Sequence, residues 1–168
     1  MYLRLKFSSS PRNFSNEMKL MPKGDSFSKK MKRTLPLILI VEDDDDTRIM
    51  MKYLLTLWGY EIIEAIDGEE GFRMAEEYQP DIILMDYSLP KNDGLTTTKQ
   101  IRELAMHGET PIIFISAHTE ASVRESALAA GADDFLTKPV DFGQLENALD
   151  KHSKNKNILK QQVIGGVL

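Results

Sequence analysis

Short apolar runs alternate with amphipathic segments along most of this 168-residue chain. Runs 37–41 and 82–85 are continuously apolar and short, which is typical of strands that are buried on both faces. The segments between such runs repeat apolar residues at helical spacing, as Met51, Leu55 and Trp58 do. Strict alternation of five strands with five helices predicts an α/β fold, with a parallel sheet covered by helices on both faces.

The expected strands are residues 37–41, 60–63, 81–85, a run within 111–116, and 134–137. Helices are expected from about 45 to 58, from 67 to 78, from 94 onward, from 119 to about 130, and from 141 to 151. Predicted helix caps include Asp67, Thr119 and Asp141. On the helix after Asp67, the apolar residues Phe72, Ala75 and Tyr78 are expected on one side. Periodicity leaves the strand order open, but the doubly wound, flavodoxin-like order 2-1-3-4-5 is the common solution at this size.

Charge divides the chain into an extension and a domain. Residues 1–34 carry nine Lys and Arg residues against Glu17 and Asp25, whereas the remainder carries twelve basic and 24 acidic residues. The extension lacks hydrophobic periodicity, so we expect a disordered basic segment, with binding to nucleic acid or an anionic surface as the alternative. The predicted domain covers residues 35–152, and residues 153–168 are expected to form a short tail without an output domain.

The absence of cysteine excludes disulfide frameworks, thiolate metal sites and cysteine nucleophiles. It fits a reducing compartment, so a cytoplasmic location is expected. No apolar run approaches the roughly 20 residues that a membrane-spanning helix needs, so no membrane span is predicted.

Acidic residues follow two predicted strands at their carboxyl ends. Glu42 and Asp43 follow the first strand, and Asp86 follows the third. In the order 2-1-3-4-5 the ends of strands 1, 3, 4 and 5 meet, which adds Ser116 and Lys138 to the same edge. Two carboxylates 4 Å apart repel by about 4 kcal/mol at an effective dielectric near 20, and a divalent cation removes that repulsion. An all-oxygen ligand set favours Mg²⁺ over zinc.

Lys138 adds a second positive charge at this edge. Together with a metal ion it can hold a phosphoryl group beside Asp86, which can then attack in line and become an aspartyl phosphate. The residues thus indicate a phosphoryl acceptor rather than a nucleotide-binding fold, because the first strand ends in acids and not in glycines.

With these residues in place, the chain resembles the receiver domain of two-component response regulators from about Leu35 to His152. Each fragment is weak alone, but their order and spacing are specific, with Asp86 lying 43 positions after Asp43. The fragments are Ile38-Leu39-Ile40-Val41-Glu42-Asp43-Asp44, Asp86-Tyr87-Ser88-Leu89-Pro90, Asp93-Gly94, Ser116-Ala117, Gly131-Ala132-Asp133-Asp134-Phe135 and Lys138-Pro139.

The resemblance implies a role for each matched position. Asp86 is similar to the phosphoacceptor, and Asp43 to the direct Mg²⁺ ligand. Glu42 resembles the acid that acts mostly through water, and Ser88 would lend its backbone carbonyl to the metal. Lys138 is similar to the phosphate-binding lysine, and a cis peptide bond would precede Pro139.

Ser116 and Phe135 resemble the switch pair of the family, in which Ser116 moves toward the phosphoryl group and Phe135 rotates inward. Surface candidates on the partner face are Arg124, Glu125, Gln144, Asn147 and Lys151. His118 lies where the family tunes phosphoryl lifetime, with an ordinary loop histidine as the equal alternative; His107 and His152 are interpreted as surface residues.

The implied function is a stand-alone response regulator, a signalling phosphoprotein rather than an enzyme for other substrates. A histidine kinase or phosphotransfer protein would phosphorylate Asp86, and an unknown downstream protein would read the switched face or take the phosphoryl group in a phosphorelay. No direct DNA-binding domain is expected. The main alternative is a phosphorylation-independent binding module, which usually lacks an acid or the lysine. A phosphatase acting on small substrates is disfavoured, because Ser88 stands where a second aspartate is usual.

Overall fold

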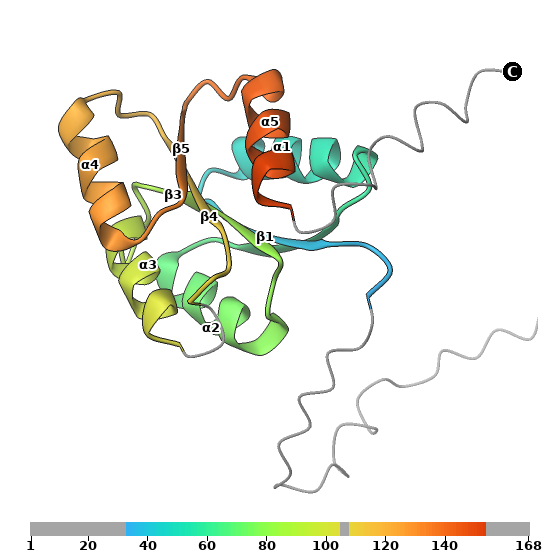
Figure 1. Cartoon of the computed structure of the whole chain (residues 1–168), viewed down its shortest axis with the longest axis horizontal. Helices are drawn as coiled ribbons and strands as arrows, with labels where there is room; N and C mark the ends of the chain where they lie inside the picture. The colour runs from blue at the N-terminus through green and yellow to red at the C-terminus, as the bar shows by residue number, and fades with distance from the viewer. Residues whose placement is uncertain (1–32, 105–107, 154–168) are drawn as a thin grey trace, which may run out of the picture. The chain divides into compact units, whose positions relative to one another are not determined.

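The computed structural model describes residues 33–104 and 108–153 (Figure 1). Five strands and five helices alternate along the described chain. They are β1 (Leu37–Val41), α1 (Asp45–Leu57), β2 (Glu61–Ala65), α2 (Gly68–Tyr78), β3 (Ile82–Asp86), α3 (Gly94–Glu103), β4 (Ile112–Ser116), α4 (Ala121–Ala130), β5 (Asp134–Thr137) and α5 (Phe142–His152).

All five strands form one parallel sheet in the order β2-β1-β3-β4-β5, which confirms the predicted topology. In the register, Leu39 lies opposite Ile83, and Met85 opposite Phe114. The chain changes direction across the sheet between β1 and β3, which is the switch point where such folds bind ligands at the carboxyl ends of the strands.

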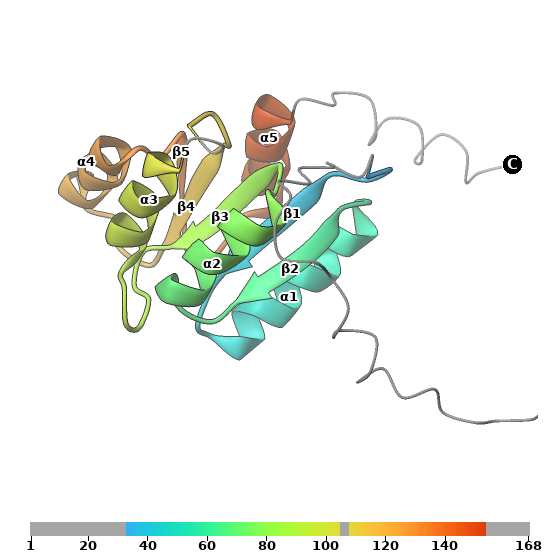
Figure 2. The same cartoon turned by 90° about the horizontal axis from the view of Figure 1, so that it is seen from below.

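Helices cover both faces of the sheet, as Figures 1 and 2 show. Side chains alternate along each strand, so Ile38 and Ile40 face α1 and α5, whereas Leu39 and Val41 face α2, α3 and α4. Strands β1, β3 and β4 are fully buried, and burying each large aliphatic side chain stabilises the fold by about 1.5–3 kcal/mol. This rigid central sheet fixes the positions of the strand ends.

Several local predictions needed correction. The second strand is Glu61–Ala65 rather than 60–63, because it pairs with β1 over five residues, beyond its apolar core. Thr119 is not the cap of α4; Glu120 occupies that position and makes no side-chain capping bond. On α2, Ala75 is buried, whereas Tyr78, expected on the same side of the helix, is 42% exposed at its C-terminal end. Asp67 and Asp141 cap α2 and α5 as predicted.

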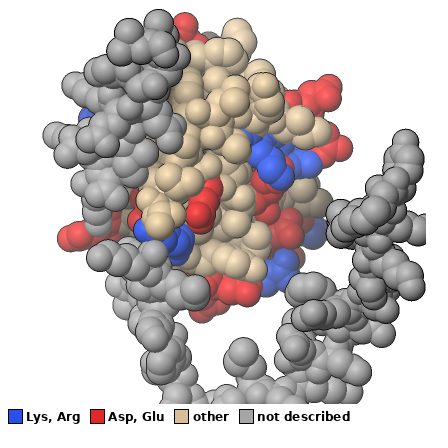
Figure 3. Space-filling view, turned by 90° about the vertical axis from the view of Figure 1, so that its right-hand side faces the viewer, with Lys and Arg blue, Asp and Glu red and all other residues tan. Residues whose placement is uncertain are grey.

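The basic extension and the tail fall outside the described residues, apart from 33–34 and 153. His107 also lies outside them. Arg33 donates to the carbonyl oxygens of Tyr78 and Gln79 at 2.6 and 3.1 Å, so it caps the last turn of α2. Among residues 33–104 and 108–153, no helix is long and apolar enough to cross a membrane. On the face in Figure 3, acidic and basic side chains of the described residues lie side by side among uncharged ones.

Candidate functional site

Three strand ends bring two carboxylates and one ammonium group into contact. The Lys138 ammonium, just after β5, lies 2.8 and 2.9 Å from the two carboxylate oxygens of Glu42 and 2.9 Å from Asp86 Oδ1. Glu42 and Asp86 are buried at 1% and 5% exposure, and the Lys138 side chain is 22% exposed. The peptide bond between Lys138 and Pro139 is cis. This contact could be anticipated only once the strand order was assumed.

Asp43 completes a group of three carboxylates with Glu42 and Asp86. One oxygen of each lies within 4.8 Å of the others. Glu42 and Asp86 are buried, whereas Asp43 is exposed, so the group opens to solvent on one side. Hard carboxylate oxygens at this spacing fit Mg²⁺, which usually keeps several waters and binds one or two protein carboxylates. The donor set therefore suits the expected ion.

The charges of this group are not balanced by Lys138 alone. Burial raises the pKa of Glu42 above its ordinary value; the hydrogen bond from Lys138 offsets part of this effect, and the Asp86 charge adds to it. Burial opposes the charge of Lys138, but its hydrogen bonds to Glu42 and Asp86 outweigh that cost and raise its pKa. A further cation beside the carboxylates would favour the ionised form of Glu42.

The loop after β3 holds the Asp86 side chain from the other side. The Ser88 backbone N–H donates to Asp86 Oδ2 at 3.0 Å. Gly94, at the start of α3, passes so close that a Cβ there would lie 2.2 Å from the Asp86 carbonyl oxygen. Lys91 bridges to Asp67 at 2.6 Å and ties the loop to the turn after β2. The sequence interpretation missed this bridge.

Ser116 lies at the end of β4 and is fully buried. Its hydroxyl oxygen accepts a hydrogen bond from the backbone N–H of His118 at 3.0 Å. The His118 ring lies 3.4 Å from the Ser88 hydroxyl and packs edge-on against Tyr87, with ring centres 5.6 Å apart. The histidine therefore links the loops after β3 and β4, both of which border the carboxylate group.

Phe135 is buried at 6% exposure among the side chains between the sheet and α4. The guanidinium carbon of Arg124, on α4, lies 5.9 Å from the centre of its ring, within cation–π range. Phe135 lies opposite Phe114, whereas Ser116 lies opposite Thr137, so the predicted switch residues belong to neighbouring strands two positions apart.

His152, predicted to be a surface residue, instead has only 15% of its side chain exposed and lies 3.3 Å from Asp134 at the start of β5. Lys151 also contacts Asp134, at 2.9 Å, although its own side chain is 62% exposed. These contacts tie the end of α5 to the first residue of β5, at the opposite end of that strand from Lys138.

A five-stranded parallel α/β domain with an acidic group and a lysine at the carboxyl edge of its sheet is the arrangement of a signalling receiver domain. The chain belongs to the response regulator receiver domain family, whose family model matches residues 38–150.

Among curated proteins, the chain is similar to the transcriptional regulatory protein PrrA of Mycobacterium tuberculosis. The two are 38% identical over 112 residues, which is 67% of this chain and 47% of PrrA. It is also 39% identical over 102 residues to the alkaline phosphatase synthesis transcriptional regulatory protein PhoP of Bacillus subtilis, covering 61% of this chain and 42% of PhoP. The chain thus spans about half the length of these relatives.

Two solved structures show the same fold. The receiver domain of the sensor histidine kinase PA1611 from Pseudomonas aeruginosa PAO1 is 34% identical, with a TM-score of 0.66 over 70% of this chain and 96% of that one. That structure has a magnesium ion coordinated in its active site cleft. The chemotaxis protein CheY4 of Vibrio cholerae is 28% identical, with a TM-score of 0.67 over 70% of this chain and 98% of that one.

Proposed function

We propose that this receiver domain accepts a phosphoryl group on Asp86 in a Mg²⁺-dependent reaction. The observation that carries the proposal is the contact of Lys138 with both Glu42 and Asp86, beside a group of three carboxylates. Glu42, Asp43 and the backbone carbonyl of Ser88 would hold the metal together with Asp86. The bound Mg²⁺ would neutralise charge on the phosphoryl oxygens.

In the proposed reaction a carboxylate oxygen of Asp86 attacks the phosphorus of a phosphohistidine on a histidine kinase or phosphotransfer protein. The new O–P bond forms as the N–P bond breaks, and the electron pair stays on the donor imidazole. Lys138, now between Glu42 and Asp86, would bind a phosphoryl oxygen, and the Ser116 hydroxyl would donate to another. Hydrolysis of the aspartyl phosphate at the same site returns the domain to its starting state.

Support for a protein donor comes from α1. Four large apolar side chains on its outer side, Ile49, Met50, Tyr53 and Leu57, are 40–68% exposed. The helix begins directly after the acidic residues of the site, so a helix of the donor packed on this stripe would lie next to Asp86. We therefore expect Tyr53→Asp to slow transfer from a kinase while leaving phosphorylation by a small-molecule donor unchanged.

The reader of the signal is proposed to be a protein that binds the surface of α4, β5 and α5. Ser116 and Phe135 would couple this surface to the phosphoryl group, because Ser116 borders the site and Phe135 packs under Arg124 of α4. Movement of Ser116 toward the phosphoryl group would release its bond to the His118 N–H and change the loop that leads into α4.

Intact-mass measurement tests the proposal directly. Wild-type protein incubated with acetyl phosphate and Mg²⁺ should gain one phosphoryl group, and EDTA should prevent the gain. Asp86→Asn should abolish it, whereas Asp46→Asn, which removes an exposed acid from the first turn of α1, should not. A gain that survives Asp86→Asn would refute the assignment, and a wild-type protein that never gains mass would favour the phosphorylation-independent binding module.

A further inference from the structure

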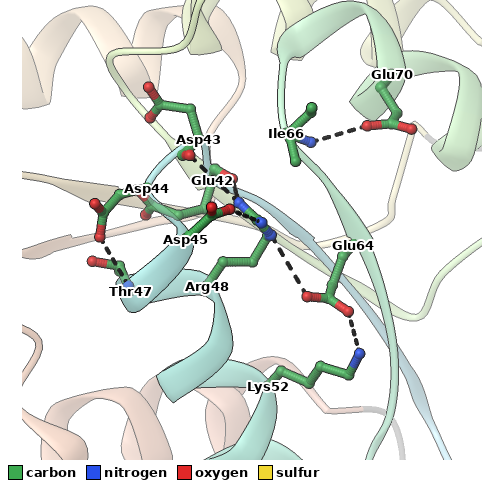
Figure 4. Close-up of polar contacts among 10 residues, drawn as sticks. All are labelled: Glu42, Asp43, Asp44, Asp45, Thr47, Arg48, Lys52, Glu64, Ile66 and Glu70. Carbon is green, nitrogen blue, oxygen red and sulfur yellow. Dashed lines mark hydrogen bonds and ion pairs between the residues drawn. The ribbon is translucent and has the colours of Figure 1, made fainter.

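Arg48 lies one turn into α1, and its side chain is only 12% exposed although it is charged. Figure 4 shows its guanidinium turned back toward the acidic segment that precedes the helix. Nη1 donates to the carbonyl oxygen of Glu42 at 2.9 Å and lies 3.5 Å from that of Asp43. Nη2 pairs with the Asp45 carboxylate, and Nε lies 3.6 Å from Glu64 Oε1 on β2. One side chain therefore joins the carboxyl end of β1 to the edge strand.

These contacts act on the backbone that carries two of the three carboxylates. The Glu42 N–H is held by the Ala65 carbonyl at 3.0 Å, so the chain is still part of the sheet at that point. Beyond it, the two peptide carbonyls that Arg48 approaches determine how the chain leaves β1. The rigid, planar fork of an arginine can hold two neighbouring carbonyls in a way that a lysine ammonium cannot.

Glu64, which anchors the Arg48 guanidinium, is itself held by a second basic residue. It forms an ion pair with Lys52, one turn further along α1, and the Glu64 side chain is 26% exposed. Glu64 is thus shared by two basic residues of the same helix, as Figure 4 shows. Since β2 contributes no carboxylate to the cluster of Glu42, Asp43 and Asp86, its proposed part in the site is to fix this arginine.

We propose that Arg48 is a positioning residue of the divalent-cation site. It does not contact the ion; it holds the carbonyls of Glu42 and Asp43 so that their side chains leave the backbone in the directions that bind Mg²⁺. The inference rests on the proposed function, because it requires Mg²⁺ at these carboxylates. Supporting groups of this kind typically change metal affinity by about 10–100-fold when they are removed.

If Arg48 acted only through its charge, a neutral replacement would raise the affinity for Mg²⁺; if it acts by positioning the carbonyls, the same replacement lowers that affinity. A positive charge near the site repels Mg²⁺, so Arg48→Gln would tighten Mg²⁺ binding if the charge alone mattered. If the arginine positions the carbonyls, Arg48→Gln weakens binding. Arg48→Lys keeps the positive charge but loses the planar guanidinium that contacts two carbonyls. It should therefore weaken Mg²⁺ binding if Arg48 positions those carbonyls, and leave binding unchanged if only the charge matters.

Isothermal titration calorimetry with MgCl₂ on the full chain tests the proposal. We expect the dissociation constant to rise about tenfold for both Arg48→Gln and Arg48→Lys. Phosphorylation by acetyl phosphate at saturating Mg²⁺ should stay near the wild-type rate, because the chemical groups remain. Arg73→Gln is the matched control: it removes an arginine that is 68% exposed and pairs with Glu70 on α2, so it should bind Mg²⁺ like the wild type.

A second variant covers the case in which the Arg48 replacements do not fold. Glu64→Asp keeps the negative charge and shortens the side chain that anchors the arginine, so the dissociation constant should rise about threefold, a smaller effect than loss of the supporting group itself. Tighter binding by Arg48→Gln, wild-type affinity in Arg48→Lys, or wild-type affinity in a folded Glu64→Asp when the Arg48 variants are unfolded would each overturn the proposal. Failure of the wild type to bind Mg²⁺ would overturn the proposed function and this inference with it.

Discussion

Lys138 is the single positive charge in direct contact with the two buried carboxylates, among the residues that the structure describes. Replacing it by methionine keeps most of the side-chain volume and removes the ammonium group. Glu42 and Asp86, exposed at 1% and 5%, would then face each other without a counter-charge. We expect Lys138→Met to destabilise the folded domain at neutral pH when Mg²⁺ is absent.

The magnitude follows from the geometry. At 2.9 Å and an effective dielectric near 20, each of the two ion pairs has a gross Coulomb energy of about 6 kcal/mol, most of which is offset by the loss of hydration. Removing one partner of a buried ion pair typically costs about 3–5 kcal/mol. The Lys138 side chain is 22% exposed and the site is open beside Asp43, so solvent relieves part of the loss. We expect a decrease in the free energy of unfolding of about 2–3 kcal/mol.

The loss of stability in Lys138→Met should grow as the pH rises from about 4 toward 7. Without the ammonium, the pKa of Glu42, already raised by burial, rises further, so the folded state binds more protons than the unfolded state above the ordinary carboxyl pKa. The stability of the variant therefore falls as the pH rises from about 4 toward 7. Below that window the Glu42 carboxyl group is protonated in both states, and the difference from the wild type should shrink.

Urea denaturation in EDTA at pH 7 and at pH 4.5 measures both effects. Lys99→Met, which removes the same charge from an exposed position on α3, is the control and should change the free energy of unfolding by less than about 0.5 kcal/mol. A Lys138→Met loss below about 0.5 kcal/mol at pH 7, or one equally large at both pH values, would show that the ammonium does not balance the buried carboxylates.

Gly68→Ala should cost about 2 kcal/mol or more in urea denaturation, because a Cβ there would lie 2.2 Å from the Asn92 carbonyl oxygen; Gly108→Ala, with open space around it, should be nearly neutral. Burial raises the pKa of Tyr60 to about 12, so wild-type stability should fall between about pH 10 and 12, and Tyr60→Phe should flatten that fall in alkaline denaturation curves. Deleting residues 1–33 should lower the melting temperature relative to deleting 1–32, because only the longer deletion removes the Arg33 cap of α2; equal values would contradict this.

Periodicity predicted the sheet because three of its strands are buried on both faces and leave an unmistakable apolar run. It misjudged β2, where Ile62 and Ile63 are followed by the polar Glu64. The strand continues through that residue because backbone pairing with β1 extends to Ala65. The Glu64 side chain forms ion pairs with Arg48 and Lys52 of α1. An edge strand is set by its partner as much as by its own pattern.

In the candidate site, too, some residues could be predicted from the sequence and one contact could not. Glu42, Asp86 and Lys138 could be predicted because each lies at or just after the carboxyl end of a strand, and neighbouring parallel strands bring these ends together. Their chemical types then define the reaction proposed for them. The Lys91–Asp67 bridge could not be predicted, because it joins two loops whose separation depends on how each leaves the sheet.

Arg48 did leave a signal in the sequence, although of an unusual kind. A cation near the N-terminus of a helix is unfavourable with respect to the helix dipole, and Asp45 and Asp46 at the start of α1 are the residues that such an end favours. The structure explains the exception, because the guanidinium turns back to backbone carbonyls at the end of β1. A charged residue that opposes a local preference and is nevertheless only 12% exposed is expected to serve the surrounding structure, and here that structure is the segment that holds Glu42 and Asp43.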